Sequence, residues 1–494
     1  MVSRRLFLSC QKYLMVTAGL HGALPLETDT CSTTCVVRRV YQHVSVQHSI
    51  YLGSHFRSIG SIEAMPAKRC PRPCAKKAGG KPVKKGHTKD KGTFNFFPDP
   101  KRGKGRSVLK RPARAKTTQW KKVPYVRSKE AVQQQRMDRT SWKRKLADLL
   151  QATDVQLVRL LREDQLLHDW TGKTCPRCGK GRLSKAQLLL GASMPRHRCN
   201  RKGCQAYINP HHLHPIFKDA TGASATPLQT QSALLFLLLN RIPHPAIHRI
   251  LHINHKAIED MENRLSHLRK RWVEEKEKSI LFGNAKTWAD VEADEATFSN
   301  TDLQEMAEDP AKPIIWEQWC GIVQRGAPHT LVLKRLTPQT SARRAPGPGA
   351  IRKIEWQPLA TKHLRDRIVV LHTDAAKSYK LKMSGVLHDH VRHCKKRVKV
   401  KGKWMWKLPT YVRVTTHKDP KTGRKFKTKG GTQIIDRAWR FLKDRIHLNQ
   451  HCRVGTPLLR AKIRSAQYEY WHRNADLWLQ TGIVCTWHVA KSLA

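Results

Sequence analysis

Acidic residues are scarce in this chain. Only 37 Asp and Glu accompany 94 Lys and Arg among 494 residues, which gives a formal net charge of +57. A field of this sign attracts polyanions, and the counterions that they release on binding supply much of the affinity. The charge balance therefore favours nucleic acid as a partner, and a membrane surface is the weaker alternative.

Long apolar runs are also missing, and cysteine is sparse. The stretch Ala233–Leu239 is far shorter than the roughly 18 apolar residues that a membrane span needs. Thirteen cysteines are an odd number and too few for a secreted disulfide scaffold. We therefore expect no integral membrane domain. The length predicts two to four domains with at least one sizeable core.

Residues 1–145 read as a basic, largely disordered N-terminal region. Residues 66–145 carry 27 Lys and Arg but only four acids, so they cannot bury enough apolar surface to fold alone. The Lys-rich stretch 76–85 could serve nuclear localisation, nonspecific DNA contact or both. The first 20 residues could form an organelle transit peptide, but the pattern favours an unstructured or misannotated start. We expect a nuclear protein.

Four cysteines carry the clearest motif. Cys175 and Cys178 are separated by two residues, Cys199 and Cys204 by four, and 20 residues lie between the pairs. These gaps are typical of two knuckles that hold structural Zn²⁺ with four thiolates. We predict a helical lead-in and zinc ribbon over residues 146–220, with short strands between the knuckles.

Residues 227–280 have the apolar periodicity of three short helices. Prolines separate the first from the second, and the third places basic residues outside its apolar stripe. A helix, a short turn and a basic second helix fit docking in the major groove. A three-helix packing unit without a DNA role has the same pattern. The predicted DNA contacts are Arg264, Arg269, Lys270 and Arg271.

The C-terminal half carries three widely spaced acids: Asp294, Asp374 and Asp436. Lys443 follows the last of them by two helical turns on the same face, where it could hold a DNA phosphate. We expect strands at 287–292, 314–323, 330–333 and 367–372, and helices at 358–366 and from residue 436 onward. Carboxylates that converge from two strand ends and a helix can hold two Mg²⁺ or Mn²⁺ ions.

The residues around these acids resemble the DDE transposases of bacterial insertion sequences that carry an N-terminal zinc ribbon. The similar stretches are Glu-Ala-Asp-Glu around Asp294, His-Thr-Asp-Ala-Ala-Lys-Ser-Tyr around Asp374, and Asp436 to Lys443 with Trp439 between them. The resemblance implies an α/β, RNase H-like catalytic domain over 286–480, in which the first and fourth strands lie side by side. It also implies double-stranded DNA as partner, at element ends and target, and a possible homo-oligomer.

This chain departs from that family at its third acid. Asp436 stands where Glu is common, Gln433 where Asn is common, and Gly431 where His is usual. A Lys/Arg-rich insertion at 395–429 precedes the helix and is expected to form a hairpin or DNA-contact loop. Within the first strand, alternation puts Glu292 on the face of Asp294 and turns Glu295 away.

These patterns lead to one principal hypothesis and two alternatives. The principal one is transposase-like cleavage and transfer of DNA strands at mobile-element ends by a two-metal mechanism, with Asp294, Asp374 and Asp436 as metal ligands. The first alternative is a catalytically inactive, transposase-derived DNA-binding protein. The second is an RNase H-like nuclease that selects particular nucleic-acid structures.

Overall fold

A computed structural model describes residues 122–127, 141–192, 194–219, 225–284, 286–303 and 306–493. The proposed transit peptide, the Lys-rich stretch 76–85 and nearly all of the basic N-terminal region lie outside the described residues. Within them, no helix combines the length and the apolar character that crossing a bilayer requires.

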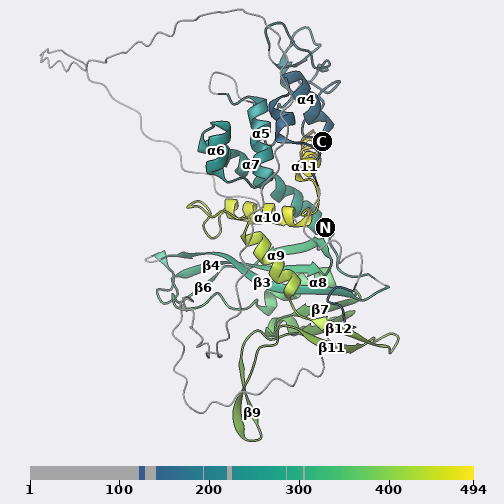
Figure 1. The fold of residues 1–494 in the computed structure, drawn as a ribbon, viewed down its shortest axis with the longest axis vertical. Coiled ribbons are helices and arrows are strands. Elements are labelled where there is room, and N and C mark those ends of the chain that lie inside the picture. Colours follow the sequence, from purple (N-terminus) through teal and green to yellow (C-terminus); the bar gives the residue numbers. More distant parts are fainter. Residues whose placement is uncertain are drawn as a thin grey trace, which may run out of the picture. The chain divides into compact units, whose positions relative to one another are not determined.

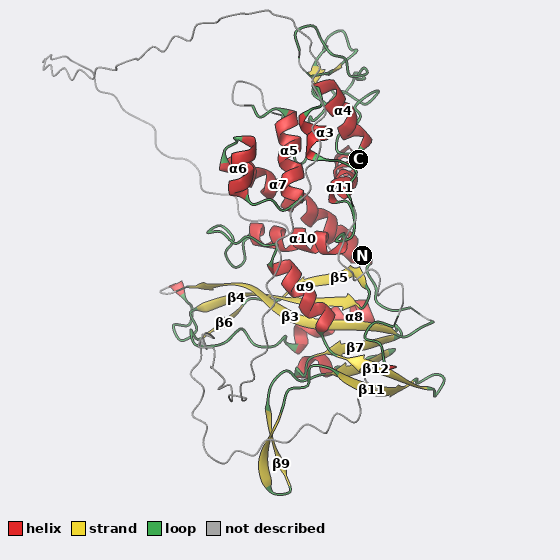
Figure 2. Ribbon diagram, viewed as in Figure 1, coloured by secondary structure: helices red, strands yellow, loops and turns green. Residues whose placement is uncertain are grey.

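Helices dominate the first half of the described chain and return at its C-terminal end (Figures 1 and 2). The helices are α3 (Leu146–Leu150), α4 (Asp154–Glu163), α5 (Leu228–Leu239), α6 (His244–Leu251), α7 (His255–Lys276), α8 (Lys353–Leu364), α9 (Gln433–Lys443), α10 (Pro457–Trp471) and α11 (Leu477–Leu493), with short 3₁₀ turns at Glu277–Ser279 and Lys377–Lys380.

Strands form one large mixed sheet and three small antiparallel pairs. The large sheet contains β3 (Ala289–Asp302), β4 (Ile314–Gln324), β5 (Ala327–Arg335), β6 (Gln339–Ser341), β7 (Val369–Thr373) and β8 (Val386–His390). The small pairs are β1 (His197–Arg198) with β2 (Tyr207–Ile208), β9 (Lys396–Val400) with β10 (Lys403–Lys407), and β11 (Arg413–Lys418) with β12 (Lys425–Gly430).

The large sheet has the strand order β5-β4-β3-β7-β8, with β6 paired to β4. The pairs β3–β4 and β4–β5 are antiparallel, whereas β3–β7 and β7–β8 are parallel. The chain reaches β7 from β5 through β6 and α8, because parallel neighbours need a crossover connection. This mixed sheet with its helices confirms the α/β class expected from the sequence.

The two faces of the sheet have separate cores. Because side chains alternate along a strand, Ala296 and Phe298 of β3 pack against α9 and α10, while Val291 and Ala293 pack on the opposite face with α8. Trp356 of α8 is fully buried in that second core. Glu292 and Asp294 therefore lie on the face of β3 that carries α9.

A third core joins helices from distant parts of the sequence. It contains Leu157 of α4, Leu235 of α5, Leu265 of α7 and Trp478 of α11, all buried. The three helices expected over 227–280 are present as α5, α6 and α7. The C-terminal helix α11 was not predicted, and it packs against α5 and α7 rather than against the sheet.

Most strands predicted for the C-terminal half are confirmed, with altered bounds. The strand β3 continues eight residues beyond Asp294 to Asp302, so this acid lies within a strand and not at its end. The helix α8 begins at Lys353 and carries Pro358 inside it. The insertion 395–429 forms two hairpins, β9–β10 and β11–β12, where one was expected.

Candidate active site and metal centre

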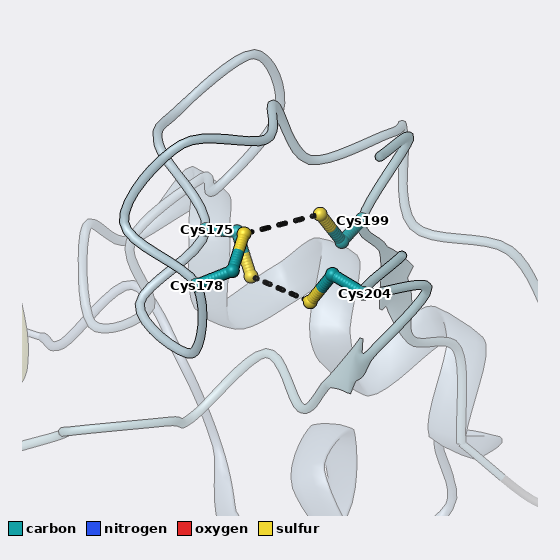
Figure 3. A group of neighbouring side chains, drawn as sticks. All are labelled: Cys175, Cys178, Cys199 and Cys204. Carbon is teal, nitrogen blue, oxygen red and sulfur yellow. Dashed lines mark hydrogen bonds between the residues drawn. The ribbon is translucent and has the colours of Figure 1, made fainter. Parts of the chain in front are cut away.

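The four predicted zinc ligands gather at one point between two short antiparallel segments (Figure 3). Their sulfur atoms all lie within 4.8 Å of one another, with Cys178 to Cys199 at 3.8 Å and Cys175 to Cys204 at 4.0 Å. Four thiolates at about 2.3 Å from a tetrahedral Zn²⁺ would lie about 3.8 Å apart. The cluster therefore has the ligand number and spacing of a closed structural zinc site.

A backbone hydrogen bond favours the thiolate form of one of the four cysteines. The N–H of Gly181 donates to Sγ of Cys178 over 3.3 Å, and this hydrogen bond is the main reason that the pKa of Cys178 falls to about 6. A side chain at Gly181 would collide with Sγ of Cys199. Gly181 is therefore the glycine that lies in contact with the sulfur atoms.

Asp294 and Asp374 lie on neighbouring parallel strands. Glu292 of β3 pairs with His372 of β7, and the two aspartates follow two residues later on each strand. Asp374 is the first residue after β7, where its Oδ1 accepts a 2.9 Å hydrogen bond from the N–H of Ala376. The parallel pairing of β3 with β7 thus brings these two acids, which are distant in the chain, to the same level of the sheet.

The helix α9 carries Asp436 and packs over β3 and β4. Trp439 lies one turn after Asp436, and its Nε1 donates a 3.2 Å hydrogen bond to Oδ2 of Asp294. Its ring rests on Gly321 of β4, which pairs with Asp294, and a Cβ at Gly321 would lie 2.5 Å from the indole. Only glycine lets the indole approach the sheet this closely.

Glu292 anchors the N-terminus of α9. Its Oε2 accepts hydrogen bonds from the N–H groups of Ile434 (2.7 Å) and Ile435 (2.9 Å), and its Oε1 pairs with Arg325 at 2.6 Å. The carboxylate is fully buried, and its negative charge suits the positive end of the helix. The prediction that Glu292 shares the face of Asp294 is confirmed, but its contacts make it a clamp for α9 and leave it no open position for a metal.

A short piece of the N-terminal region also reaches this clamp. Tyr125 donates a 2.7 Å hydrogen bond from its hydroxyl to Glu292, and the same oxygen accepts one of 2.9 Å from the N–H of Gln433. The guanidinium of Arg325 lies 3.8 Å from the centre of the Tyr125 ring. These contacts hold residues 122–127 against the sheet.

Negative charge accumulates around Asp294. Burial is the largest cause that raises the pKa of Asp294 well above its ordinary value, and repulsion from Glu295 is the next. Asp436 and Asp374 raise it further, so the three predicted ligands act on one another electrostatically. Desolvation also raises the pKa of Asp436. A cluster of acids that resists ionisation in the absence of a counter-charge is suited to bind cations.

The three aspartates are nevertheless more widely spaced than the four cysteines. In the part of the chain that the structure describes, the cysteines are the only group in which three or more ligand atoms lie within 4.8 Å of one another. Two metal ions about 3.5–4 Å apart, each about 2.1 Å from its oxygen ligands, would separate ligands on opposite sides by about 8 Å. Ligands on opposite sides of such an ion pair therefore need not lie within 4.8 Å of one another.

Glu295 points to the opposite face of the sheet, as alternation predicted. Its Oε1 accepts a 2.6 Å hydrogen bond from the hydroxyl of Tyr379 and a 3.2 Å bond from the N–H of Ile351. Burial raises the pKa of Glu295 to about 7, in spite of these donors. This carboxyl group thus titrates near neutral pH beside the candidate site.

His372 is a buried histidine near the acids. His372 lies between Asp290, 3.0 Å from its Nε2, and Asp389, 3.8 Å from its Nδ1. Burial lowers the pKa of His372 although both neighbours oppose this. Histidines are numerous in this chain, so the sequence offered no signal that this one is enclosed by the sheet.

The four basic residues predicted to contact DNA differ in accessibility. Arg271 is exposed on α7, and Arg264 and Lys270 are half-buried. Arg269 is 2% exposed and pairs with Glu469 of α10 at 2.6 Å. The prediction for Arg269 is wrong, because the face of α7 that carries it packs against α10. Lys443 is exposed at the C-terminal end of α9.

No protein-family model matches this chain, and no curated protein matches it. Among solved structures, the chain is similar to one in the crystal structure of the Mos1 strand transfer complex, with 15% sequence identity and a TM-score of 0.10. The match covers 33% of this chain and 56% of that chain, so it spans little more than half of the solved protein. At this TM-score we draw no argument from the likeness.

Proposed function

We propose that this chain is a transposase-like enzyme that cleaves DNA and transfers DNA strands by a two-metal mechanism. The observation that carries the proposal is the meeting of three acids from distant segments. Asp294 and Asp374 stand level on adjacent parallel strands, and the Trp439–Asp294 hydrogen bond holds α9 with Asp436 beside them.

The sheet supports an RNase H-like assignment for this domain. Three antiparallel strands, a crossover helix and two parallel strands occur in the order 3-2-1-4-5 when the strands of the main path are numbered along the chain. The first and fourth of these, β3 and β7, lie side by side, as the resemblance implies for that fold. The first two candidate acids come from this pair.

The carboxylates fit divalent cations, since Mg²⁺ and Mn²⁺ prefer hard oxygen ligands. When bound, two such ions would neutralise charge on the phosphodiester and activate the attacking oxygen. Asp294 and Asp374 would hold them from the sheet, and Asp436 would complete the set from α9. Lys443, exposed two turns further along α9, would position a DNA phosphate.

The rest of the protein would bind DNA. The Cys175–Cys204 ribbon is a closed four-thiolate site with no open position, so its zinc would be structural. Exposed Arg271 on α7 and the Lys-rich hairpins β9–β10 and β11–β12 offer cationic surface for the phosphate backbone.

Purified full-length protein should nick or join DNA that carries the inverted repeats flanking its coding region, and only with Mg²⁺ or Mn²⁺. Asp374→Asn should abolish this reaction and leave DNA binding intact. A matched control is Asp366→Asn, because Asp366 is exposed with φ of 59°, which Asn tolerates.

Three outcomes would change the assignment. Cleavage that persists in Asp374→Asn would overturn the two-metal site. Tight DNA binding without cleavage of any substrate would favour an inactive, transposase-derived DNA-binding protein. Cleavage of hybrids or junctions, with linear duplex left intact, would favour a structure-selective nuclease.

A further inference from the structure

A second charged site lies apart from the acids, between the helices that precede the sheet and α10. A cavity of about 450 Å³ opens between α5, α6 and α7 on one side and α10 with the segment after α9 on the other. Its charged lining residues are Arg241, Glu259, Glu262, Arg269, Arg445, Lys462 and Glu469. The proposed DNA chemistry does not use this cavity.

One carboxylate in the cavity faces three guanidinium groups. Glu469 of α10 pairs with Arg241, with Nη1 of Arg269 at 2.6 Å and with Nε of Arg445 at 3.4 Å. Burial alone would raise the pKa of Glu469, but Arg241 and Arg269 lower it overall. The carboxylate is therefore ionised, and it still compensates only one of the three positive charges.

Two further acids that line the cavity have partners outside the three guanidinium groups. Glu262 is engaged by Lys462, 3.2 Å away, and Glu259 accepts a 2.8 Å hydrogen bond from Asn449. Burial lowers the pKa of Arg445, and the charge of Arg241 lowers it further. The positive charge of Arg241 therefore disfavours the charged form of Arg445.

Several donors in the cluster lack an acceptor. Nε and Nη2 of Arg269 are buried without a hydrogen-bond partner, and Nε of Arg445 has only its 3.4 Å ion-pair contact with Glu469, which does not have hydrogen-bond geometry. The aromatic rings nearby cannot satisfy them, because Tyr468 and Phe441 lie against the faces of these two guanidinium groups. Unmatched buried donors are costly, so a ligand that accepts hydrogen bonds would stabilise this arrangement.

We propose that this cavity binds a phosphate group, held by Arg241, Arg269 and Arg445. A phosphate carries the negative charge that the cluster lacks and offers several acceptor oxygens to forked guanidinium donors. The cavity is large enough for a phosphate with its remaining hydration shell. The group comes from free phosphate or from the DNA backbone, and the experiment separates these two sources.

The test uses the full-length protein and inorganic phosphate, compared with chloride at matched ionic strength. Saturating phosphate should raise the Tm by about 2 °C or more, because a ligand that binds only the folded state stabilises it. Arg445→Gln should remove this shift. Arg440→Gln is the matched control, since Arg440 is an exposed cation on α9 outside the cavity and the shift should persist.

A second variant removes negative charge from the cavity, whereas Arg445→Gln removes positive charge. Glu469→Gln removes the only carboxylate among the three guanidinium groups, so the Tm should fall without phosphate and recover more with phosphate than in the wild type. A phosphate-induced shift that is equal in the wild type and Arg445→Gln overturns the proposal, because it then reflects nonspecific binding to a basic chain. No shift beyond that of chloride in the wild type overturns it as well.

Duplex DNA identifies the source of the phosphate group. If the DNA backbone occupies the cavity, saturating duplex should remove the phosphate-induced shift and Arg445→Gln should weaken duplex binding. If a free anion occupies it, the shift should persist with DNA bound. Neither result depends on metal-dependent cleavage, so failure of the enzymatic proposal would leave this one standing.

Discussion

Trp439 donates a hydrogen bond from its indole to the carboxylate of Asp294, and this contact ties α9 to the strand β3. The same indole covers Gly321, the residue that pairs with Asp294 on β4. A single side chain therefore contacts both the sheet at Gly321 and the buried carboxylate of Asp294. The first two predictions test these two roles separately.

Trp439→Phe should lower the apparent affinity of the protein for Mg²⁺ more than it lowers the free energy of unfolding. The variant keeps an aromatic ring over Gly321 but removes the donor to Asp294, which raises the pKa of this acid further and disfavours its charged form. A hydrogen bond of this kind contributes about 0.5–1.5 kcal/mol, so the Mg²⁺ concentration for half-maximal cleavage should rise roughly two- to tenfold. An unchanged Mg²⁺ titration would show that the hydrogen bond has no catalytic consequence.

Gly321→Ala should destabilise the protein by about 1–3 kcal/mol, the usual cost of overpacking a core. The added methyl group would lie 2.5 Å from the Trp439 ring and 3.0 Å from Ile435. Denaturant unfolding measures the effect. Gly347→Ala is the control, because a Cβ there meets no atom within 4 Å. Equal stability of the two variants would mean that α9 does not press on the sheet at Gly321.

Cys199→Ser should remove zinc and unfold the ribbon. Metal analysis should find about one zinc atom per wild-type chain and almost none in the variant, because three thiolates with a hydroxyl bind Zn²⁺ far more weakly. A chelator should have the same effect on the wild type. Cys394→Ser provides the control, since Cys394 is exposed and lies outside the cluster. Full zinc content in Cys199→Ser would contradict the assignment of the ligands.

Glu295→Gln should change how stability depends on pH. The folded-state pKa of Glu295 is about 7, above the ordinary value of 4.5, so the folded protein binds the proton more tightly than the unfolded chain. The resulting stabilisation is present below about pH 4.5, is lost as pH rises toward 7, and is absent above it. It amounts to at most about 3 kcal/mol.

The measurement is the Tm of both proteins at pH 5 and pH 8. The variant cannot titrate at this position, so its Tm relative to the wild type should be higher at pH 8 than at pH 5. The hydroxyl of Tyr379 can donate to the amide oxygen of Gln, which preserves the local contact. A constant difference between the two proteins would show that Glu295 does not titrate in this range.

Local patterns predicted the elements well where a single periodicity runs through the segment. The helices α5, α6 and α7 and the strand β4 lie close to their expected positions, because apolar spacing reports which face of an element is buried. The sequence also predicted the four-cysteine cluster, because the turn that presents both sulfur atoms sets the gap within each pair.

The spacing of residue types along the sequence did not predict which helices and strands pack together. Arg269 stands directly before Lys270 and Arg271 in α7, yet it pairs with Glu469 on a helix 200 residues later. The docking of Tyr125 on Glu292 links residues 167 positions apart. Such contacts arise from the packing of whole elements, which no window of sequence contains.

By itself, the sequence determined the charge of this protein, the four cysteines that cluster and the side of β3 on which Glu292 and Asp294 lie. These properties depend on composition or on the short-range geometry of turns and strands. Only the tertiary structure decided that Asp374 is the neighbour of Asp294, that α9 is clamped by Glu292 and that Arg269 is enclosed. Pairing of strands and packing of helices join residues that are distant in the chain, and local periodicity carries no information about such partners.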